Sequence, residues 1–259
     1  ISFQPAELCK IAMIIFIPFM IEKMDRKAQT LKGALLLIAL GGLVSFLIWK
    51  ISDNMSSAII IGGIAVAVVF IVSRRVWPYL LMGAVGIAAF VHFVISGMEN
   101  SENFRFRRVI AWLNPEKYAS DLAYQTMQAL YAIGSGGLFG KGLGNSTQKM
   151  VLPEAQNDMI FSIICEELGI FGVCIVMVLF VMLLYRLLVI AENAPDLYSS
   201  LMVTGIFAHI AIQVVLNIAV VTNTIPNTGV TLPFISYGGT SILFLMAEMG
   251  LALGVSRRI

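Results

Sequence analysis

Apolar residues run along this chain in long stretches separated by shorter polar segments. Most stretches reach the ~20 residues that a helix needs to cross a hydrocarbon core, although the first is shorter. We therefore predict an all-α integral membrane protein, a polytopic helical bundle that forms a single membrane domain over residues 1–259. The seven predicted spans are 8–22, 31–49, 56–73, 77–97, 159–188, 198–221 and 237–255.

The composition agrees with this class. Hydrophobic residues make up 59% of the 259 residues and charged residues 12%, about half the charged share of soluble domains. The mean hydropathy of +0.90 excludes a soluble domain with a large core. Cys9, Cys165 and Cys174 lie in apolar segments without metal-ligand spacing, so we predict packed thiols.

Basic residues predict the orientation of the spans. They follow the first, third, fifth and seventh spans, as Lys23, Arg26, Lys27, Lys32, Arg74, Arg75, Arg186, Arg257 and Arg258. Short loops rich in lysine and arginine stay in the cytoplasm. We therefore expect Ile1 outside, Ile259 inside and residues 98–158 as one large extracellular loop. Because the chain opens at Ile1 without Met, we also expect missing residues before it.

The large loop mixes acids and bases, and two interpretations stay open. The charges balance, as in a solvated loop, but Arg105-Phe106-Arg107-Arg108 combines bases with an aromatic ring. Such a segment is typical of an interfacial helix that binds phosphate groups. A second helix is predicted over 124–132, where Gln125 and Gln128 share a face.

Asp158 is the leading candidate for chemistry. It ends a polar, Gly-rich strip over 142–158 and directly precedes the apolar run Met159-Ile160-Phe161. A carboxylate at the boundary of water and membrane is partly desolvated, and this raises its pKa toward that of a useful base.

Several polar residues lie inside the predicted spans. Glu7 and Lys10 share one helical face, as a local ion pair or as the charged wall of an outward-facing cavity. His209, Gln213 and Asn217 recur every four residues, a pattern that favours interhelical hydrogen bonds.

Three carboxylates and one loop add further candidates. Glu166, Glu167 and Glu248 lie within spans, where acidic residues are costly and default to functional hypotheses. The prolines of 225–241 forbid a regular helix, so this segment is predicted to line the cavity that contains Asp158.

Short motifs follow one another along essentially the whole chain. They are Gln4-Pro5-Ala6-Glu7 with Lys10, Arg108-Val109 with Asn114-Pro115, Tyr124-Gln125 with Gln128, Gly134 to Gly137, Leu152-Pro153-Glu154, Asp158 with Phe161, Glu166-Glu167-Leu168-Gly169, and Leu232-Pro233-Phe234-Ile235-Ser236-Tyr237-Gly238-Gly239. With these motifs in this order, the chain resembles the SEDS (shape, elongation, division and sporulation) family of FtsW/RodA-like peptidoglycan glycosyltransferases.

The details favour the division branch of that family. The strip over 144–149 and the basic run over 105–108 look more like this branch than the elongation branch. Ala6 stands where the family has Ser, and Gln156-Asn157 replaces a usual His-Thr. Because family members usually have ten spans, about three spans are expected to be absent from the N-terminus.

The resemblance implies an enzyme of the bacterial cytoplasmic membrane that polymerises lipid II into β-1,4 glycan strands on the outer face. Asp158 matches the family's proposed catalytic residue and would act as general base with inversion at the donor carbon. The implied substrate-binding residues are Glu7, Lys10, Arg105, Arg107, Arg108, Gln125, Gln128, Lys149 and Glu154. No metal ligand is assigned, although Mg²⁺ or Mn²⁺ could share the charge of the leaving diphosphate. The implied partners are the membrane and a class B penicillin-binding protein, and no nucleic acid is expected.

Two other functions stay open. A lipid II flippase would use a similar cavity without a base, but it needs polar lining through the whole membrane, whereas the candidate chemistry here concentrates outside. A scaffold that recruits a transpeptidase would need no chemistry at all, and this role can coexist with catalysis.

Overall fold

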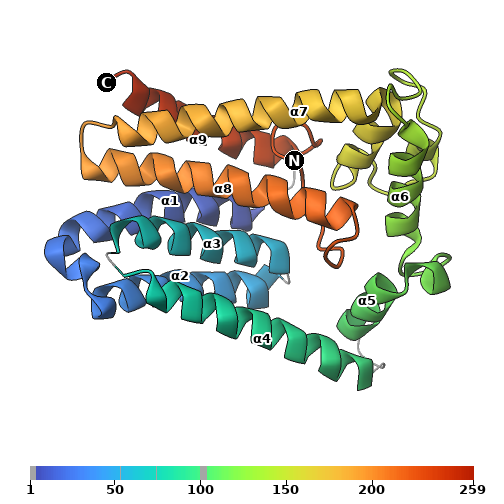
Figure 1. Cartoon of the computed structure of the whole chain (residues 1–259). Coiled ribbons are helices and arrows are strands. Elements are labelled where there is room, and N and C mark those ends of the chain that lie inside the picture. The colour runs from blue at the N-terminus through green and yellow to red at the C-terminus, as the bar shows by residue number, and fades with distance from the viewer. Residues whose placement is uncertain (1–3, 53, 74, 100–103) are drawn as a thin grey trace. The chain divides into compact units, whose positions relative to one another are not determined.

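The computed structural model describes residues 4–52, 54–73, 75–99 and 104–259, and within these ranges all regular structure is helical (Figure 1). The helices are α1 (Pro5–Met24), α2 (Leu31–Ser52), α3 (Met55–Val72), α4 (Trp77–Glu99), α5 (Phe104–Leu113), α6 (Tyr124–Gly136), α7 (Ile160–Glu192), α8 (Leu197–Val221) and α9 (Gly239–Ser256). Three short 3-10 helices, Asp25–Gln29, Pro115–Tyr118 and Gln148–Met150, lie in the connections.

The predicted all-α membrane class is confirmed. Among the described residues, five helices are long and apolar enough to cross a membrane, namely α2, α3, α7, α8 and α9. Helices α1 and α4 cover the other two predicted spans, but the count of seven spans stays a prediction. The fifth predicted span, 159–188, corresponds to α7, which extends to Glu192 and is interrupted at Gly169.

Contacts within the chain define two compact units, which are described separately. Unit 1 contains Ile1–Val76, Leu179–Val215 and Tyr237–Ile259, and unit 2 contains Trp77–Val178 and Leu216–Ser236. Helices α7 and α8 each contribute residues to both units. The assignment of the whole chain to a single domain stays a prediction.

Small residues let the helices of unit 1 approach closely. Helix α3 packs on both α1 and α2 (Figure 1). A side chain at Gly41 of α2 would place its Cβ 2.3 Å from that of Ala65 on α3. A Cβ at Gly63 of α3 would lie 2.6 Å from Cδ1 of Ile212 on α8. Close packing at small residues is a main source of stability for helices in membranes, where lipid is as apolar as the side chains.

Unit 2 holds the large loop together through its own contacts. Met127 of α6 packs with Ala111 of α5 and with Ala123 in a small apolar cluster. Nε1 of Trp112 donates to the backbone oxygen of Asn223 at 3.0 Å, and Nδ2 of Asn223 donates back to the oxygen of Trp112 at 3.4 Å. These contacts connect the end of α5 to the turn that follows α8.

We expect Gly41→Val to destabilise the protein by about 1–3 kcal/mol, because the new side chain must force α2 and α3 apart. Thermal unfolding in detergent would measure the loss. Gly42→Val is the matched control, since a Cβ at Gly42 has nothing within 4 Å. Equal loss in the two variants would contradict close α2–α3 packing as the cause.

Candidate active site

Asp158 lies in unit 2, two residues before the start of α7. Nε2 of Gln125 on α6 donates to its Oδ1 at 3.3 Å. Nδ2 of Asn217 on α8 donates to the Asp158 backbone oxygen at 2.8 Å and to that of Val230 at 2.6 Å. The position of the carboxylate is therefore fixed through its side chain by one helix and through its backbone by another.

The amide of Gln125 connects three segments. Besides Asp158, its Nε2 donates to the backbone oxygen of Pro153 at 3.2 Å. Its Oε1 accepts from Nδ2 of Asn227 at 2.9 Å, and Oδ1 of Asn227 accepts from the backbone of Gly229 at 3.1 Å. With both ends of the amide engaged, Gln125 is held in the orientation that presents a donor to Asp158.

The segment after α8 contacts Asp158, as predicted for 225–241. A Cβ at Gly229 would lie 3.9 Å from Oδ2 of Asp158, and the φ of Gly229 is +66°. Oγ of Ser236 donates to the backbone oxygen of Asn157 at 2.6 Å and accepts from the nitrogen of Leu232 at 2.7 Å. That this segment lines a cavity at membrane depth stays a prediction.

Partial burial raises the pKa of Asp158 from its usual 3.8 to about 6. Backbone hydrogen bonding and the donor Gln125 oppose the rise, while the negative charge of Glu154 adds to it. The expected desolvation of this carboxylate is therefore confirmed. Near pH 7 the group is mostly ionised, yet it is a much stronger base than an ordinary aspartate.

A second cluster of unit 2 centres on Glu166, whose side chain is completely buried in α7. Nζ of Lys141 donates to its Oε1 at 2.6 Å, and Oγ of Ser146 donates to its Oε2 at 2.5 Å. Further donors, at 2.8 to 3.3 Å, are the Ser135 hydroxyl, the hydroxyl and backbone nitrogen of Thr147, and the backbone nitrogen of Gln148. We call Glu166 with these donors the Glu166 clamp. Through these hydrogen bonds Glu166 holds residues 135–148 in place, which is a structural role.

The same loop completes the interruption of α7. Gly169 has φ +65° and ψ −167°, so the helical hydrogen bonds stop there. The backbone nitrogens of Lys141 and Gly142 donate to the carbonyls of Glu166 and Glu167, both at 2.9 Å. The nitrogens of Ile170 and Phe171 donate to the carbonyls of Gly137 and Leu138, at 3.0 and 3.1 Å. Backbone groups that the break would leave unpaired are thus satisfied by the loop.

Glycines make this close approach possible. A Cβ on Gly169 would lie 2.4 Å from the backbone nitrogen of Gly140, and a Cβ on Gly136 would lie 1.9 Å from the carbonyl oxygen of Cys165. The predicted stop at Gly134 to Gly137 is confirmed as the end of α6. These glycines do more than end a helix, because they let it and the following loop contact the α7 backbone.

The other predicted substrate-binding residues of the large loop differ in their exposure and in their contacts. Lys149 is exposed in the 3-10 helix Gln148–Met150, and its backbone donates to Ser146 of the Glu166 clamp. Glu154 is exposed and accepts from the amide of Asn157. Gln128 is half-buried, one turn beyond Gln125 on α6.

The basic run falls on α5, so the predicted helix forms there. Arg107 pairs with Asp121 at 3.1 Å, and both side chains are about half exposed. Arg108 is exposed. The side chain of Arg105 lies outside the described residues, as does Arg74 of the predicted cytoplasmic loops.

Four of the polar residues predicted within spans form two buried pairs in unit 1. Nζ of Lys10 donates to Oε1 of Glu7 at 2.7 Å, and their side chains are 3% and 8% exposed. Nδ1 of His209 on α8 lies 2.8 Å from Oε2 of Glu248 on α9. The prediction of interhelical bonding is therefore confirmed for His209. For Asn217 it is wrong, because this side chain binds the backbones of Asp158 and Val230 in the loops.

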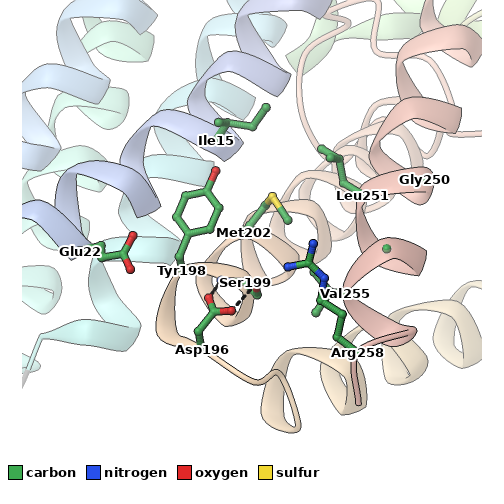
Figure 2. A pocket seen from close by; sticks show the side chains of 11 residues that line it. Ile15, Glu22, Asp196, Tyr198, Ser199, Met202, Gly250, Leu251, Val255 and Arg258 are labelled. Carbon is green, nitrogen blue, oxygen red and sulfur yellow. Dashed lines mark hydrogen bonds between the residues drawn. The ribbon is translucent and has the colours of Figure 1, made fainter.

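A cavity of about 510 Å³ in unit 1 contains none of the predicted site residues. Figure 2 shows its walls, which come from α1, α8, α9 and the residues that flank them. Asp196 there accepts from the nitrogen and hydroxyl of Ser199, at 2.8 and 3.0 Å, and so caps the start of α8.

Comparison with known proteins decides the family. A sequence profile of the FtsW/RodA/SpoVE family, described as a cell cycle protein, matches residues 1–259. The chain belongs to the FtsW/RodA/SpoVE family. The resemblance drawn from the motifs is thereby confirmed.

Relatives within the FtsW/RodA/SpoVE family carry both sporulation and division names. The chain is 41% identical to stage V sporulation protein E of Bacillus subtilis over 99% of its own length and 69% of that protein. It is 34% identical to a probable peptidoglycan glycosyltransferase FtsW of Geobacter metallireducens, over 100% of this chain and 68% of the relative. Assignment to the division branch stays a prediction.

Two solved structures are similar in fold. A chain from a peptidoglycan synthase complex that coordinates polymerization and crosslinking matches with a TM-score of 0.79 and 28% identity, over 99% of this chain and 70% of that chain. Thermus thermophilus RodA, a rod shape determining protein, matches with a TM-score of 0.66 and 28% identity, over 99% of this chain and 66% of that chain.

We expect Glu166→Gln to loosen the Glu166 clamp, because a neutral amide no longer balances the Lys141 ammonium and directs its own hydrogens toward donors. Trypsin should then cut after Lys141 several times faster than in the unchanged protein. Glu154→Gln, an exposed change outside the clamp, should leave this rate unaltered. Equal cutting of Glu166→Gln and the unchanged protein would contradict the clamp.

Proposed function

We propose that this chain is a peptidoglycan glycosyltransferase that polymerises lipid II, the undecaprenyl-diphosphate-linked disaccharide pentapeptide, on the outer face of the bacterial cytoplasmic membrane. The observation that carries the proposal is Asp158, a single half-buried carboxylate with a pKa near 6 next to the start of a membrane helix. Membership of the FtsW/RodA/SpoVE family and the similarity to glycosyltransferases named FtsW support it.

In the proposed reaction, Asp158 takes the proton of the acceptor's GlcNAc 4-hydroxyl. The oxygen attacks C1 of the donor MurNAc and forms the new glycosidic bond. The bond from C1 to the lipid diphosphate breaks, and its electron pair leaves with the diphosphate. An α-linked donor gives a β-1,4 product, so the centre inverts in a single displacement and one general base suffices.

Gln125 is the positioning residue of this mechanism. Its donor to Oδ1 stabilises the ionised carboxylate, and its contacts with Pro153 and Asn227 keep that donor in place. Burial and the charge of Glu154 act in the opposite direction. The base strength of Asp158 is the balance of these effects.

Cations must stabilise the leaving diphosphate, and the large loop offers several. Lys149 and Arg108 are exposed, and Arg107 would have to exchange its half-exposed partner Asp121 for a phosphate. Among the described residues, no group of three or more His, Cys, Asp or Glu side chains could hold a metal by itself. Mg²⁺ or Mn²⁺ could share this work, with the exposed carboxylate of Glu154 as a protein ligand. When bound, it would neutralise charge on the leaving group.

Glu7 and Lys10 are proposed to form part of the wall that holds the lipid-linked substrate. Their ion pair is nearly neutral as a whole and buried in unit 1. If Lys10 moved from Glu7 to a substrate phosphate, it would exchange one charge-assisted hydrogen bond for another and leave the buried Glu7 carboxylate in need of a new donor.

Lipid II translocation is less well supported than polymerisation. Among the described residues of unit 1, the buried Lys10 pairs with Glu7, and Nδ1 of the buried His209 lies 2.8 Å from Oε2 of Glu248. Side chains that bond to each other within the protein do not form a polar path for a sugar headgroup.

We further propose that a crosslinking transpeptidase of the class B penicillin-binding type is the partner, since one similar structure comes from a complex that coordinates polymerization and crosslinking.

The decisive variant is Asp158→Asn, which keeps the shape and removes the base. With the full-length protein, its transpeptidase partner and labelled lipid II, glycan chain length is read on a gel. We expect a loss of at least about 10²-fold in polymerisation, the range for a general base. Glu116→Gln, an exposed change in the same loop, is the control.

Equal polymer from Asp158→Asn and the unchanged protein would reject the assignment of the base. If neither protein made polymer while liposomes still showed lipid II crossing, translocation would replace polymerisation as the proposed function.

The acid limb of the polymerisation rate should report the pKa of Asp158 near 6, because only the ionised carboxylate accepts a proton. Gln125→Met removes a donor that favours the charged form and should move the limb to higher pH. Glu154→Gln removes a like charge and should move it to lower pH. Rate–pH profiles of the unchanged protein and the two variants test these opposite shifts. Shifts in the same direction in both variants would contradict the electrostatic account of the pKa of Asp158.

A further inference from the structure

The loop of the Glu166 clamp exposes large apolar side chains. Leu138, Phe139 and Leu143 are 65%, 81% and 77% exposed. Removing such side chains from water is favourable, so three neighbouring exposed ones are unfavourable in water. Apolar groups gathered in this way mark a surface that something else covers.

The position of these side chains is set by the fold. The carbonyls of Gly137 and Leu138 accept from Ile170 and Phe171 at the interruption of α7. Lys141, two residues before Leu143, binds the buried Glu166 through its side chain and through its backbone. Leu138, Phe139 and Leu143 therefore stay beside the residues that follow Gly169.

Those residues are the start of a stretch that can cross a membrane alone. From 170 to 192, α7 runs for 23 residues after its interruption. At 1.5 Å per residue this is roughly 35 Å, more than the ~30 Å of a hydrocarbon core. The loop is thus attached to α7 at the level where the helix leaves the hydrocarbon.

The exposed apolar surface continues from the loop onto this helix. Phe171, Ile175 and Val178 follow one another on one helical face and are 63%, 48% and 56% exposed. A face of this kind on a spanning helix lies against lipid or another span. The loop carbonyl of Leu138 binds the nitrogen of Phe171, at the first position of the face.

The charges of the loop favour a lipid surface. No acidic residue occurs between Asp121 and Glu154, and the only charged residues there are Lys141 and Lys149. Lys141 is neutralised by Glu166. A surface with apolar side chains, no acidic residue and a lysine beside it is suited to the boundary between headgroups and acyl chains in a bilayer that contains anionic lipid.

We propose that Leu138, Phe139 and Leu143 insert into the leaflet on the side of Asp158, next to the start of the span 170–192. The occupant of this surface is lipid. Inserted side chains would fix the height of the Glu166 clamp, and with it the loop that leads to Asp158, relative to the membrane. The proposal depends on the spanning of α7 and is independent of glycosyl transfer.

The test is the depth of a nitroxide label at position 139. Full-length protein without Cys9, Cys165 and Cys174 carries a single cysteine as Phe139→Cys and is reconstituted in vesicles of phosphatidylethanolamine and phosphatidylglycerol. Power saturation compares collisions with oxygen, which concentrates in lipid, and with a water-soluble nickel chelate. Ile175→Cys gives the lipid reference and Gln156→Cys, exposed in the same large loop, the water reference.

We expect the label at 139 to collide several-fold more with oxygen than with the chelate, as at position 175. A label that behaves like the one at 156 would overturn the insertion. A label hidden from both reagents would also overturn it and would show that protein covers the surface. Leu143→Cys provides an independent second position for the same measurement.

Discussion

The buried carboxylate of Glu166 is the constraint on which the loop between α6 and α7 in unit 2 depends. A charge without exposure is costly unless donors surround it, and the fold supplies them from Lys141, Ser146 and the neighbouring loop residues. Because most of these donors come from a Gly-rich strip without regular structure, the carboxylate determines the conformation of that strip. The interruption of α7 completes the arrangement by pairing backbone with backbone.

Asp158 and Glu166 are both acids at the start of α7, but their surroundings differ in kind. Glu166 is saturated with donors, one of them a lysine. Asp158 receives one side-chain donor, from Gln125, and is opposed by a neighbouring acid. A saturated carboxylate cannot easily take a proton from a substrate, whereas one with few donors and partial burial can. This contrast distinguishes a structural acid from a chemical one only eight residues apart in the chain.

The structural features that depend on residues close together in the chain can be predicted from the sequence. The apolar runs locate the helices, and the abutment of Asp158 on Met159 predicts its desolvation. Contacts between distant segments are not contained in such patterns. The interruption of α7 at Gly169 depends on residues about 30 positions earlier, and Asn227 reaches Gln125 over 102 positions. Asn217 is visible as part of a polar stripe, but its partners are loop carbonyls that no periodicity reveals.

The interruption at Gly169 also divides α7 into a short part and a long part. Residues 160–168 form a short helical arm that is connected to the long part of α7 by one non-helical glycine. The loop 137–142 bonds to both sides of this joint. Asp158 lies two residues before the start of this arm, where Gln125 and Asn217 hold it. The conformation of the loop and the position of the carboxylate are therefore linked through one short helical segment.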